Sequence, residues 1–273
     1  MVVAAAAMLL ASCGQAGSQP ASPDEPGSLT VRLAPAVTDK VAGGPNSAGR
    51  PIVVIDPGHG GRDPGAPSVS GQVTEKQLTL VLAEALRDEL VKRGRVRVAL
   101  TREKDDYPTR EERAAMARRL GASLFLSIHM DSAPNPLARG ASVYSLSDVA
   151  SDADAERLAQ KENGNLGIDD GASNAVDAML SELAVRGQMT QSADLAARLV
   201  RKAAGRIELR PDPHRFAAFH VLRSAGTAAI LFEAGYLSNA DDELLLRSPE
   251  YRAKLVTALA QAIEADVAAR GRR

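Results

Sequence analysis

The sequence predicts an α/β fold: a single domain with a largely parallel, twisted sheet flanked by helices. From residue 51 onward, short apolar runs alternate with longer segments in which apolar residues recur at helical spacing. Strands that alternate with helices form parallel sheets, because each helix returns the chain across the sheet. The chain has 273 residues, of which 45% are hydrophobic and 25% are charged, and this composition suits one sizeable domain.

The first half of this domain contains four expected strands and two expected helices. The strands are the apolar runs at residues 52–56, 96–100, 123–129 and 141–146. The first helix begins at Thr74, which fits a capping box with Gln77, and Gly94 ends it. A second helix is expected at residues 109–121.

The second half of the domain is more helical. Helices are expected at residues 152–163, 175–187, 192–205 and 249–270, and strands at residues 219–222 and 228–235. The second of these helices has an apolar stripe formed by Val176, Met179, Leu180 and Leu183. The segment from about 148 to 187 exceeds what the sheet requires, so we expect a helical insertion near the active site.

The N-terminus is typical of a targeting segment. Residues 2–12 form an apolar run that is too short to span a membrane, and Cys13 closes the sequence LASC, which resembles the lipobox of bacterial lipoproteins. We therefore expect a signal peptide with a lipobox at residues 1–13, lipidation of Cys13 and a flexible linker at residues 14–50. The alternative is an ordinary secretory signal in which Cys13 is incidental.

Composition limits the partners and the location of this chain. The net charge is -1 and aromatic residues make up 3% of the chain, so no nucleic acid is expected as a partner. We expect an exported, periplasmic monomer that meets the membrane only through a lipid anchor. Because Gly14 rather than Asp follows Cys13, the outer membrane is the expected site of anchoring.

Four polar residues are expected to meet at one edge of the sheet. His59 follows the first strand, His129 ends a central strand and Glu233 ends the last strand. Glu75 lies in the first turn of the helix after His59, where the helix dipole favours an ionised carboxylate. Ligands of such sheets gather beyond the carboxyl ends of the strands. This edge is therefore the candidate functional site.

The residue types at this edge indicate zinc chemistry. Two imidazoles and a carboxylate are ligands that zinc prefers, with a fourth position left for a water whose pKa falls to about 7. A second carboxylate is then needed as general base and later as acid, and Glu233 is the candidate. Spacing alone is weak support, because the residues are far apart in sequence. Asp56 and Asp63 are alternative ligands, although capping of turns is their expected role.

Three further polar residues have less defined roles. Arg113 is expected to form a structural ion pair rather than to bind substrate. His214 and His220 lack acidic neighbours at ligand-like positions. His220 falls within the expected strand at 219–222, whereas His214 is a candidate for the lining of the cleft.

Five segments stand in order along the domain: IDPGHGGRDPGA, TEKQLTL, TREKDDYPTREERAAMAR, LFLSIHMDS and ILFEAGYLSN. They resemble the successive motifs of the zinc-dependent N-acetylmuramoyl-L-alanine amidases of the amidase_3 family, cell-separation type. The resemblance extends from about Ile52 to the C-terminal helix. Departures are minor, since Phe-Glu-Ala at 232–234 replaces the more usual Val-Glu-Thr and Met130 replaces a common Ala.

The resemblance implies a function and a set of site residues. His59, Glu75 and His129 would bind Zn²⁺, and Glu233 would be the catalytic carboxylate. Residues 51–273 would form the zinc amidase catalytic domain. Its substrate would be peptidoglycan, in which it would hydrolyse the amide bond between N-acetylmuramic acid and L-alanine for wall remodelling and daughter-cell separation. The alternatives are a non-catalytic peptidoglycan-binding protein and a zinc peptidase that acts on other amides.

The resemblance also bears on the insertion. In family members active in cell separation, a comparable helix covers the zinc cleft until a protein activator displaces it. An acid from such a lid could take the coordination position of the water. The candidates are Asp148, Glu156, Glu162 and Glu182. The alternative is a helical cap that only shapes the cleft.

Overall fold

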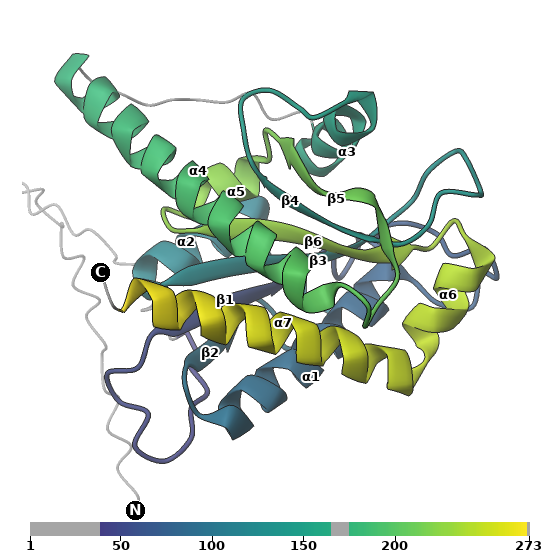
Figure 1. The fold of residues 1–273 in the computed structure, drawn as a ribbon, viewed down its shortest axis with the longest axis horizontal. Coiled ribbons are helices and arrows are strands. Elements are labelled where there is room, and N and C mark those ends of the chain that lie inside the picture. The colour runs from purple at the N-terminus through teal and green to yellow at the C-terminus, as the bar shows by residue number, and fades with distance from the viewer. Residues whose placement is uncertain (1–38, 165–174, 272–273) are drawn as a thin grey trace, which may run out of the picture. The chain divides into compact units, whose positions relative to one another are not determined.

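The computed structural model describes residues 39–164 and 175–271, in which a six-stranded sheet lies between two layers of helices (Figure 1). The expected signal peptide, Cys13 and most of the expected linker lie outside these residues. Side chains are described throughout except at the start of the longest helix, at residues 175–181.

The sheet has the strand order β2-β1-β3-β6-β4-β5. The strands are β1 (Ile52–Pro57), β2 (Arg97–Leu100), β3 (Leu124–Asp131), β4 (Ala141–Leu146), β5 (Leu209–Ala217) and β6 (Ala229–Tyr236). β2, β1, β3 and β6 are parallel to one another. β4 runs antiparallel to β6, and β5 is parallel to β4. The expectation of a largely parallel sheet is therefore confirmed, with two reversed strands at one edge.

Helices cover both faces of the sheet. They are α1 (Glu75–Arg93), α2 (Arg110–Arg119), α3 (Ala153–Asn163), α4 (Ala175–Ala203), α5 (His220–Ser224), α6 (Ala240–Arg247) and α7 (Pro249–Arg270). α1, α7 and the C-terminal half of α4 bury their apolar sides against one face, and α2, α3 and α5 bury theirs against the other. Within β1, Val53 and Ile55 pack in the first core and Val54 in the second, as the alternation of side chains along a strand requires.

The expected start and end of the first helix are confirmed. Thr74 and Gln77 form a capping box at the beginning of α1. Gly94 ends the helix in a left-handed conformation with a φ of 68°, which glycine adopts without steric cost. The start of α1 determines where Glu75 lies relative to the strand ends.

The expected strand at 219–222 is wrong, because Phe219 is the N-cap of the short helix α5, which contains the other three residues. A four-residue apolar run does not distinguish the two structures, and Phe219 and Leu222 reach the core from a helix. The strand of this region is β5, whose Pro211 and Pro213 are unfavourable inside a sheet. They are tolerated because β5 is an edge strand.

The two helices expected at 175–187 and 192–205 are a single helix, α4. Gly187 lies inside it, at a cost of about 1 kcal/mol relative to alanine. Next to this glycine, the side chain of Gln188 donates a hydrogen bond of 2.5 Å to the carbonyl oxygen of Leu222. The C-terminal half of α4 packs in the core through Leu195, Ala196 and Leu199.

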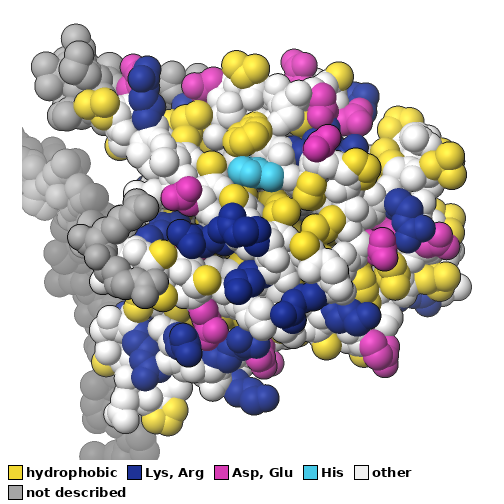
Figure 2. Space-filling view, viewed as in Figure 1, with side chains coloured by type: hydrophobic (Ala, Val, Ile, Leu, Met, Phe, Trp, Pro, Cys, Tyr) yellow, Lys and Arg dark blue, Asp and Glu magenta, His cyan; other side chains and the backbone are white. Residues whose placement is uncertain are grey.

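The outer surface of the layer formed by α1, α4 and α7 is rich in charge. Figure 2 shows Lys and Arg side chains spread over the middle and lower part of this face. Among the helices of the described residues, none has the length and the apolar character needed to cross a membrane.

Candidate metal centre

The four residues expected at one edge of the sheet do lie together. His59 follows β1, His129 lies in β3 and Glu233 lies beside it in β6, because the strand register pairs these two residues. Glu75 is the first residue of α1. His59 Nε2 lies 3.0 Å and His129 Nδ1 lies 3.1 Å from Glu75 Oε1. All four side chains are buried.

A tight loop carries His59 into the site. Its φ is 59°, an uncommon conformation for a residue other than glycine. A Cβ atom on Gly58 would lie 2.4 Å from the His129 ring, so only glycine lets this loop pass so close to the second histidine. Asp63 Oδ2 lies 2.8 Å from His59 Nδ1, and its other oxygen accepts a hydrogen bond from the Gly65 amide. Asp63 therefore caps the turn, as expected, and also orients the imidazole.

Two buried arginines form hydrogen bonds with the backbone of the same loop. Arg102 donates hydrogen bonds of 3.0 and 2.9 Å to the carbonyl oxygens of Pro57 and Gly58. Arg113 donates to the carbonyl oxygens of Pro57 and His59 at 2.8 and 2.7 Å. Sequence reasoning missed Arg102, although it lies within one of the five motifs.

Arg113 also forms the structural ion pair that was expected of it. Its guanidinium lies 2.7 Å from Asp56 Oδ1, and the hydroxyls of Thr101 and Ser127 donate to the same carboxylate at 2.6 and 2.8 Å. Burial raises the pKa of Asp56, but Arg113 and the two hydroxyls outweigh it and hold the pKa below its usual value. The expectation that Asp56 caps a turn is wrong, because its side chain is committed to this buried network beneath the loop.

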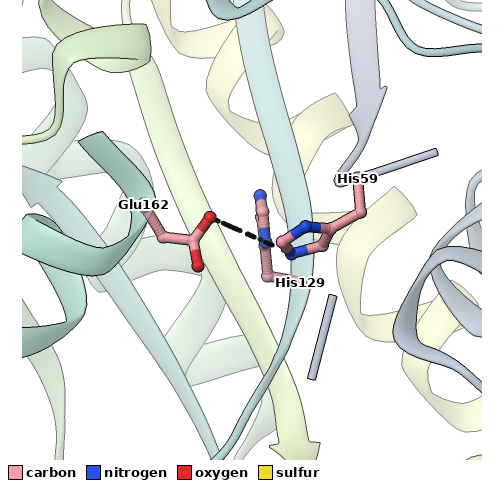
Figure 3. A group of neighbouring side chains, drawn as sticks. All are labelled: His59, His129 and Glu162. Carbon is pink, nitrogen blue, oxygen red and sulfur yellow. Dashed lines mark ion pairs between the residues drawn. The ribbon is translucent and has the colours of Figure 1, made fainter. Parts of the chain in front are cut away.

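The insertion contributes one carboxylate to the site. Glu162, near the end of α3, directs its carboxylate toward both imidazoles (Figure 3). Its Oε2 lies 3.9 Å from His59 Nε2 and 3.7 Å from His129 Nδ1. One ligand atom from each of these three residues lies within 4.8 Å of the others.

The other three candidate lid acids lie elsewhere. Asp148 forms an ion pair with Arg223. Glu182 is paired with Arg186 at 2.6 Å on the exposed surface of α4. Glu156 is exposed on α3. The structure thus brings Glu162 alone, of the four, to the histidines.

His214 and His220, for which the sequence indicates no definite role, are not part of this group. His214 Nε2 lies 2.9 Å from the hydroxyl oxygen of Ser145, and its ring packs against Phe216. His220 lies at the first position of α5, where its backbone amide donates to Asn163 Oδ1 at 2.7 Å. That contact joins the end of α3 to the rest of the domain.

The carboxylates of the site differ in the direction of their pKa shifts. Burial raises the pKa of Glu75, but hydrogen bonding with His129 and His59 outweighs it and holds the pKa well below its usual range. Burial lowers the pKa of His59, yet the carboxylates of Glu75 and then Glu162 raise it to about 9. For Glu233, burial and then the charge of Asp131 raise the pKa well above its usual range.

The residues present fit a bound metal ion. Within the described part of the chain, Glu233 Oε2 is buried without a hydrogen-bond partner. His59 Nε2 lies 3.0 Å from Glu75 Oε1 but without the geometry of a regular hydrogen bond, whereas buried polar atoms are generally well paired. Two imidazoles with an ionised carboxylate form a donor set that suits zinc. The backbone amides of Ala66 and Met130 donate to the Glu75 carboxylate at 2.7 and 3.0 Å and fix its position.

Comparison with known proteins agrees with this geometry. The family model for N-acetylmuramoyl-L-alanine amidase matches residues 53–265. The amidase AmiA of Escherichia coli is 34% identical over 224 residues, which are 80% of this chain and 76% of that protein. The amidase AmiC of Neisseria meningitidis is 32% identical over 243 residues, which are 87% of this chain and 58% of that protein.

Solved structures show the same fold. The amidase AmiC2 of Nostoc punctiforme superimposes with a TM-score of 0.56 at 27% identity, covering 82% of this chain and 99% of that one. The amidase Ami1 of Mycobacterium smegmatis gives a TM-score of 0.60 at 24% identity, with the same coverage of 82% and 99%. The chain thus belongs to the N-acetylmuramoyl-L-alanine amidase family.

Proposed function

We propose that this protein is a zinc-dependent amidase that hydrolyses the amide bond between N-acetylmuramic acid and L-alanine in peptidoglycan. The observation that carries this proposal is the convergence of His59, His129 and Glu75 beside Glu233 at the carboxyl ends of adjacent strands. The substrate is inferred from the names of the relatives, and the roles of the residues are inferred from the motifs shared with that family.

In this proposal His59, His129 and Glu75 hold the zinc ion. Bound zinc supplies a Lewis acid for the amide carbonyl and acidifies a water at neutral pH. Glu233 takes the proton from the attacking water and delivers it to the nitrogen of the leaving L-alanine. Its buried surroundings raise the pKa of this carboxyl, which makes the ionised form a stronger base toward the proton of the water. Asp63 and Arg113 keep His59 in position.

Glu162 supports a closed resting state. We propose that α3 acts as a lid whose carboxylate occupies the place of the attacking water. α3 buries only three small or medium apolar residues, Ala155, Leu158 and Ala159, so apolar burial contributes little free energy against its release. A protein activator would bind the apolar stripe of α4 and shift the population toward the open state. Of that stripe, Leu183 is 60% exposed, and the other three side chains lie outside the described residues.

We further propose that the protein is exported and anchored to the outer membrane by a lipid on Cys13. The LASC sequence after an apolar run supports this proposal. Anchoring on the periplasmic side would leave residues 14–50 as a tether between the membrane and the domain.

The deciding experiment uses purified sacculi and the zinc-loaded chain. We expect release of peptides with a new L-alanine amino terminus, loss of that release on chelation, and recovery when zinc is added back. A wall-binding protein without chemistry would bind the sacculi and release nothing. A zinc peptidase would cleave peptides that carry no muramic acid, which the proposed enzyme leaves intact.

A further inference from the structure

A second cleft, with a volume of about 1100 Å³, opens beside the metal centre. It lies between α3, the start of β5 and the loop that follows β3. Asp131 and Tyr236 line it, and these residues are paired in register at the ends of β3 and β6. The cleft therefore begins where the strands that carry His129 and Glu233 end.

The lining of this cleft has an excess of positive charge. Its lining includes four basic side chains, Arg139, Arg157, Lys161 and Arg210, and the two acids Asp131 and Asp154. Two of the cations also have acidic partners outside the lining, because Arg139 lies 3.0 Å from Asp241 and Lys161 lies 3.6 Å from Glu162. Asp154 is shared, because it pairs with Arg157 and also lies 3.8 Å from Arg210.

Arg210 is held in place by the side chain of Tyr236. Its guanidinium contacts the hydroxyl of Tyr236 and lies 5.5 Å from the centroid of that ring. Tyr236 is itself buried. A guanidinium that is fixed in this way loses little conformational freedom when it binds a carboxylate through two parallel hydrogen bonds. Because Arg210 stands on β5, it does not depend on the position of α3.

Lys161 connects this cleft to the metal centre. Its ammonium nitrogen lies 3.6 Å from Glu162 Oε1. The ammonium group of Lys161 therefore lies at the boundary between the two sites.

We propose that this cationic cleft binds carboxylate groups of the peptide that continues from the scissile amide, with Arg210 as the principal binding residue. The inference rests on the proposed function, since it assumes that a muramoyl peptide is the substrate. The cleft starts beside the reacting strand ends, so a peptide whose first residue lies at Glu233 extends into it. The wall formed by Asp131, Arg210 and Tyr236 belongs to β3, β5 and β6, so it remains available to the peptide when α3 moves away.

The test compares two probes and three proteins. The probes are an N-acetylmuramoyl tripeptide with free carboxylates and the same compound with each peptide carboxylate converted to a carboxamide. The proteins are the zinc-loaded full chain, Arg210→Gln and Arg206→Gln. Arg206 is an exposed arginine on the loop after α4 and lines no part of the cleft, so it is the matched control.

We expect Arg210→Gln to raise KM for the carboxylate probe about tenfold, the loss of one charge-assisted contact, with kcat unchanged. The carboxamide probe should have a high KM with all three proteins, and Arg206→Gln should match the parent. Arg210→Lys should recover part of the preference, because it restores the charge without the fork of the guanidinium. Equal KM values for the two probes with the parent would overturn the inference.

A binding measurement separates this inference from the proposed function. The free tripeptide without muramic acid is titrated into each protein by calorimetry, and thermal denaturation verifies that Arg210→Gln is folded. Tighter binding to the parent than to Arg210→Gln supports the cleft even if neither probe is cleaved, in which case the proposed function alone fails. Equal binding of the tripeptide by folded parent and variant, together with cleavage by both, contradicts the cleft assignment and leaves the amidase intact.

Discussion

The guanidinium of Arg113 donates a hydrogen bond of 2.7 Å to the carbonyl oxygen of His59. The same guanidinium pairs with the buried carboxylate of Asp56. One side chain on α2 thus links the charge beneath the loop to the backbone of a residue that faces the metal centre. Because His59 has a positive φ, its conformation depends on contacts of this kind.

Arg113→Met should weaken both folding and metal binding. It leaves Asp56 buried without its ion-pair partner, a change that costs about 3–5 kcal/mol, and it releases the His59 carbonyl. We expect a lower midpoint of thermal denaturation and a zinc affinity reduced roughly 10- to 100-fold, as for other groups that support metal ligands. Zinc affinity is measured by competition with a chelator, with Arg119→Met, which removes a partly exposed pair with Asp39, as control.

The double variant Asp56→Asn, Arg113→Met separates these two effects. It removes the unpaired charge of Asp56, but the contact with the His59 carbonyl is still lost. Stability should therefore recover in part, while zinc affinity stays low. Recovery of both would mean that Arg113 acts only through stability.

Acid should reduce the advantage of the Asp56–Arg113 pair. The pKa of Asp56 lies below its ordinary value in the folded protein, so the pair contributes stability above the unfolded pKa of about 3.9. That contribution is lost as the pH falls through the folded pKa. The difference in unfolding free energy between the parent and Asp56→Asn, measured with urea, should thus be largest above about pH 5 and shrink below pH 4. A difference that stays constant over this range would contradict the assignment.

Substitutions in the metal centre should separate ligands from the general base. His59→Ala and His129→Ala should abolish zinc binding, and Glu75→Gln should weaken it, because each removes one of three protein ligands. Glu233→Gln keeps the shape of the side chain, so zinc should remain bound while turnover falls roughly 10²- to 10⁴-fold. Zinc content is measured after dialysis. If Glu233→Gln loses zinc and Glu75→Gln keeps it, the two roles must be exchanged.

Removal of the Glu162 carboxylate should activate the resting enzyme. Glu162→Gln withdraws the charge that lies 3.7 and 3.9 Å from the two imidazole nitrogens. We expect basal cleavage of sacculi to rise about tenfold or more with zinc content unchanged. Glu156→Gln, an exposed position on the same helix, should have no effect. An unchanged rate in a folded, zinc-loaded Glu162→Gln protein would mean that α3 is a cap that only shapes the cleft.

Substitution of Cys13 tests the location. If the protein is lipidated there, Cys13→Ser should move it from the membrane fraction to the soluble fraction or leave it unprocessed. Labelling with a radioactive fatty acid should mark the parent and not the variant. Equal fractionation and equal labelling would leave an ordinary signal peptide as the explanation.

The sequence by itself determined the features that depend on neighbouring residues. The capping box of Thr74 and Gln77, the end of α1 at Gly94 and the apolar runs of β1, β3, β4 and β6 were all predictable, because caps and periodicity act over a few residues. The meeting of His59, Glu75, His129 and Glu233 also followed, since parallel strands present their carboxyl ends at one edge.

Only the tertiary structure decided the features that depend on contacts between distant segments. Pro211 and Pro213 become acceptable in β5 because this strand is at an edge, and α4 continues through Gly187 because its C-terminal half is packed in the core. Four acids of the insertion were equivalent in sequence, yet only Glu162 reaches the histidines. The position of Arg210 is fixed by its contact with Tyr236, which lies 26 residues away in the sequence. Periodicity reports which side of an element is buried, but it does not report which partner that side meets.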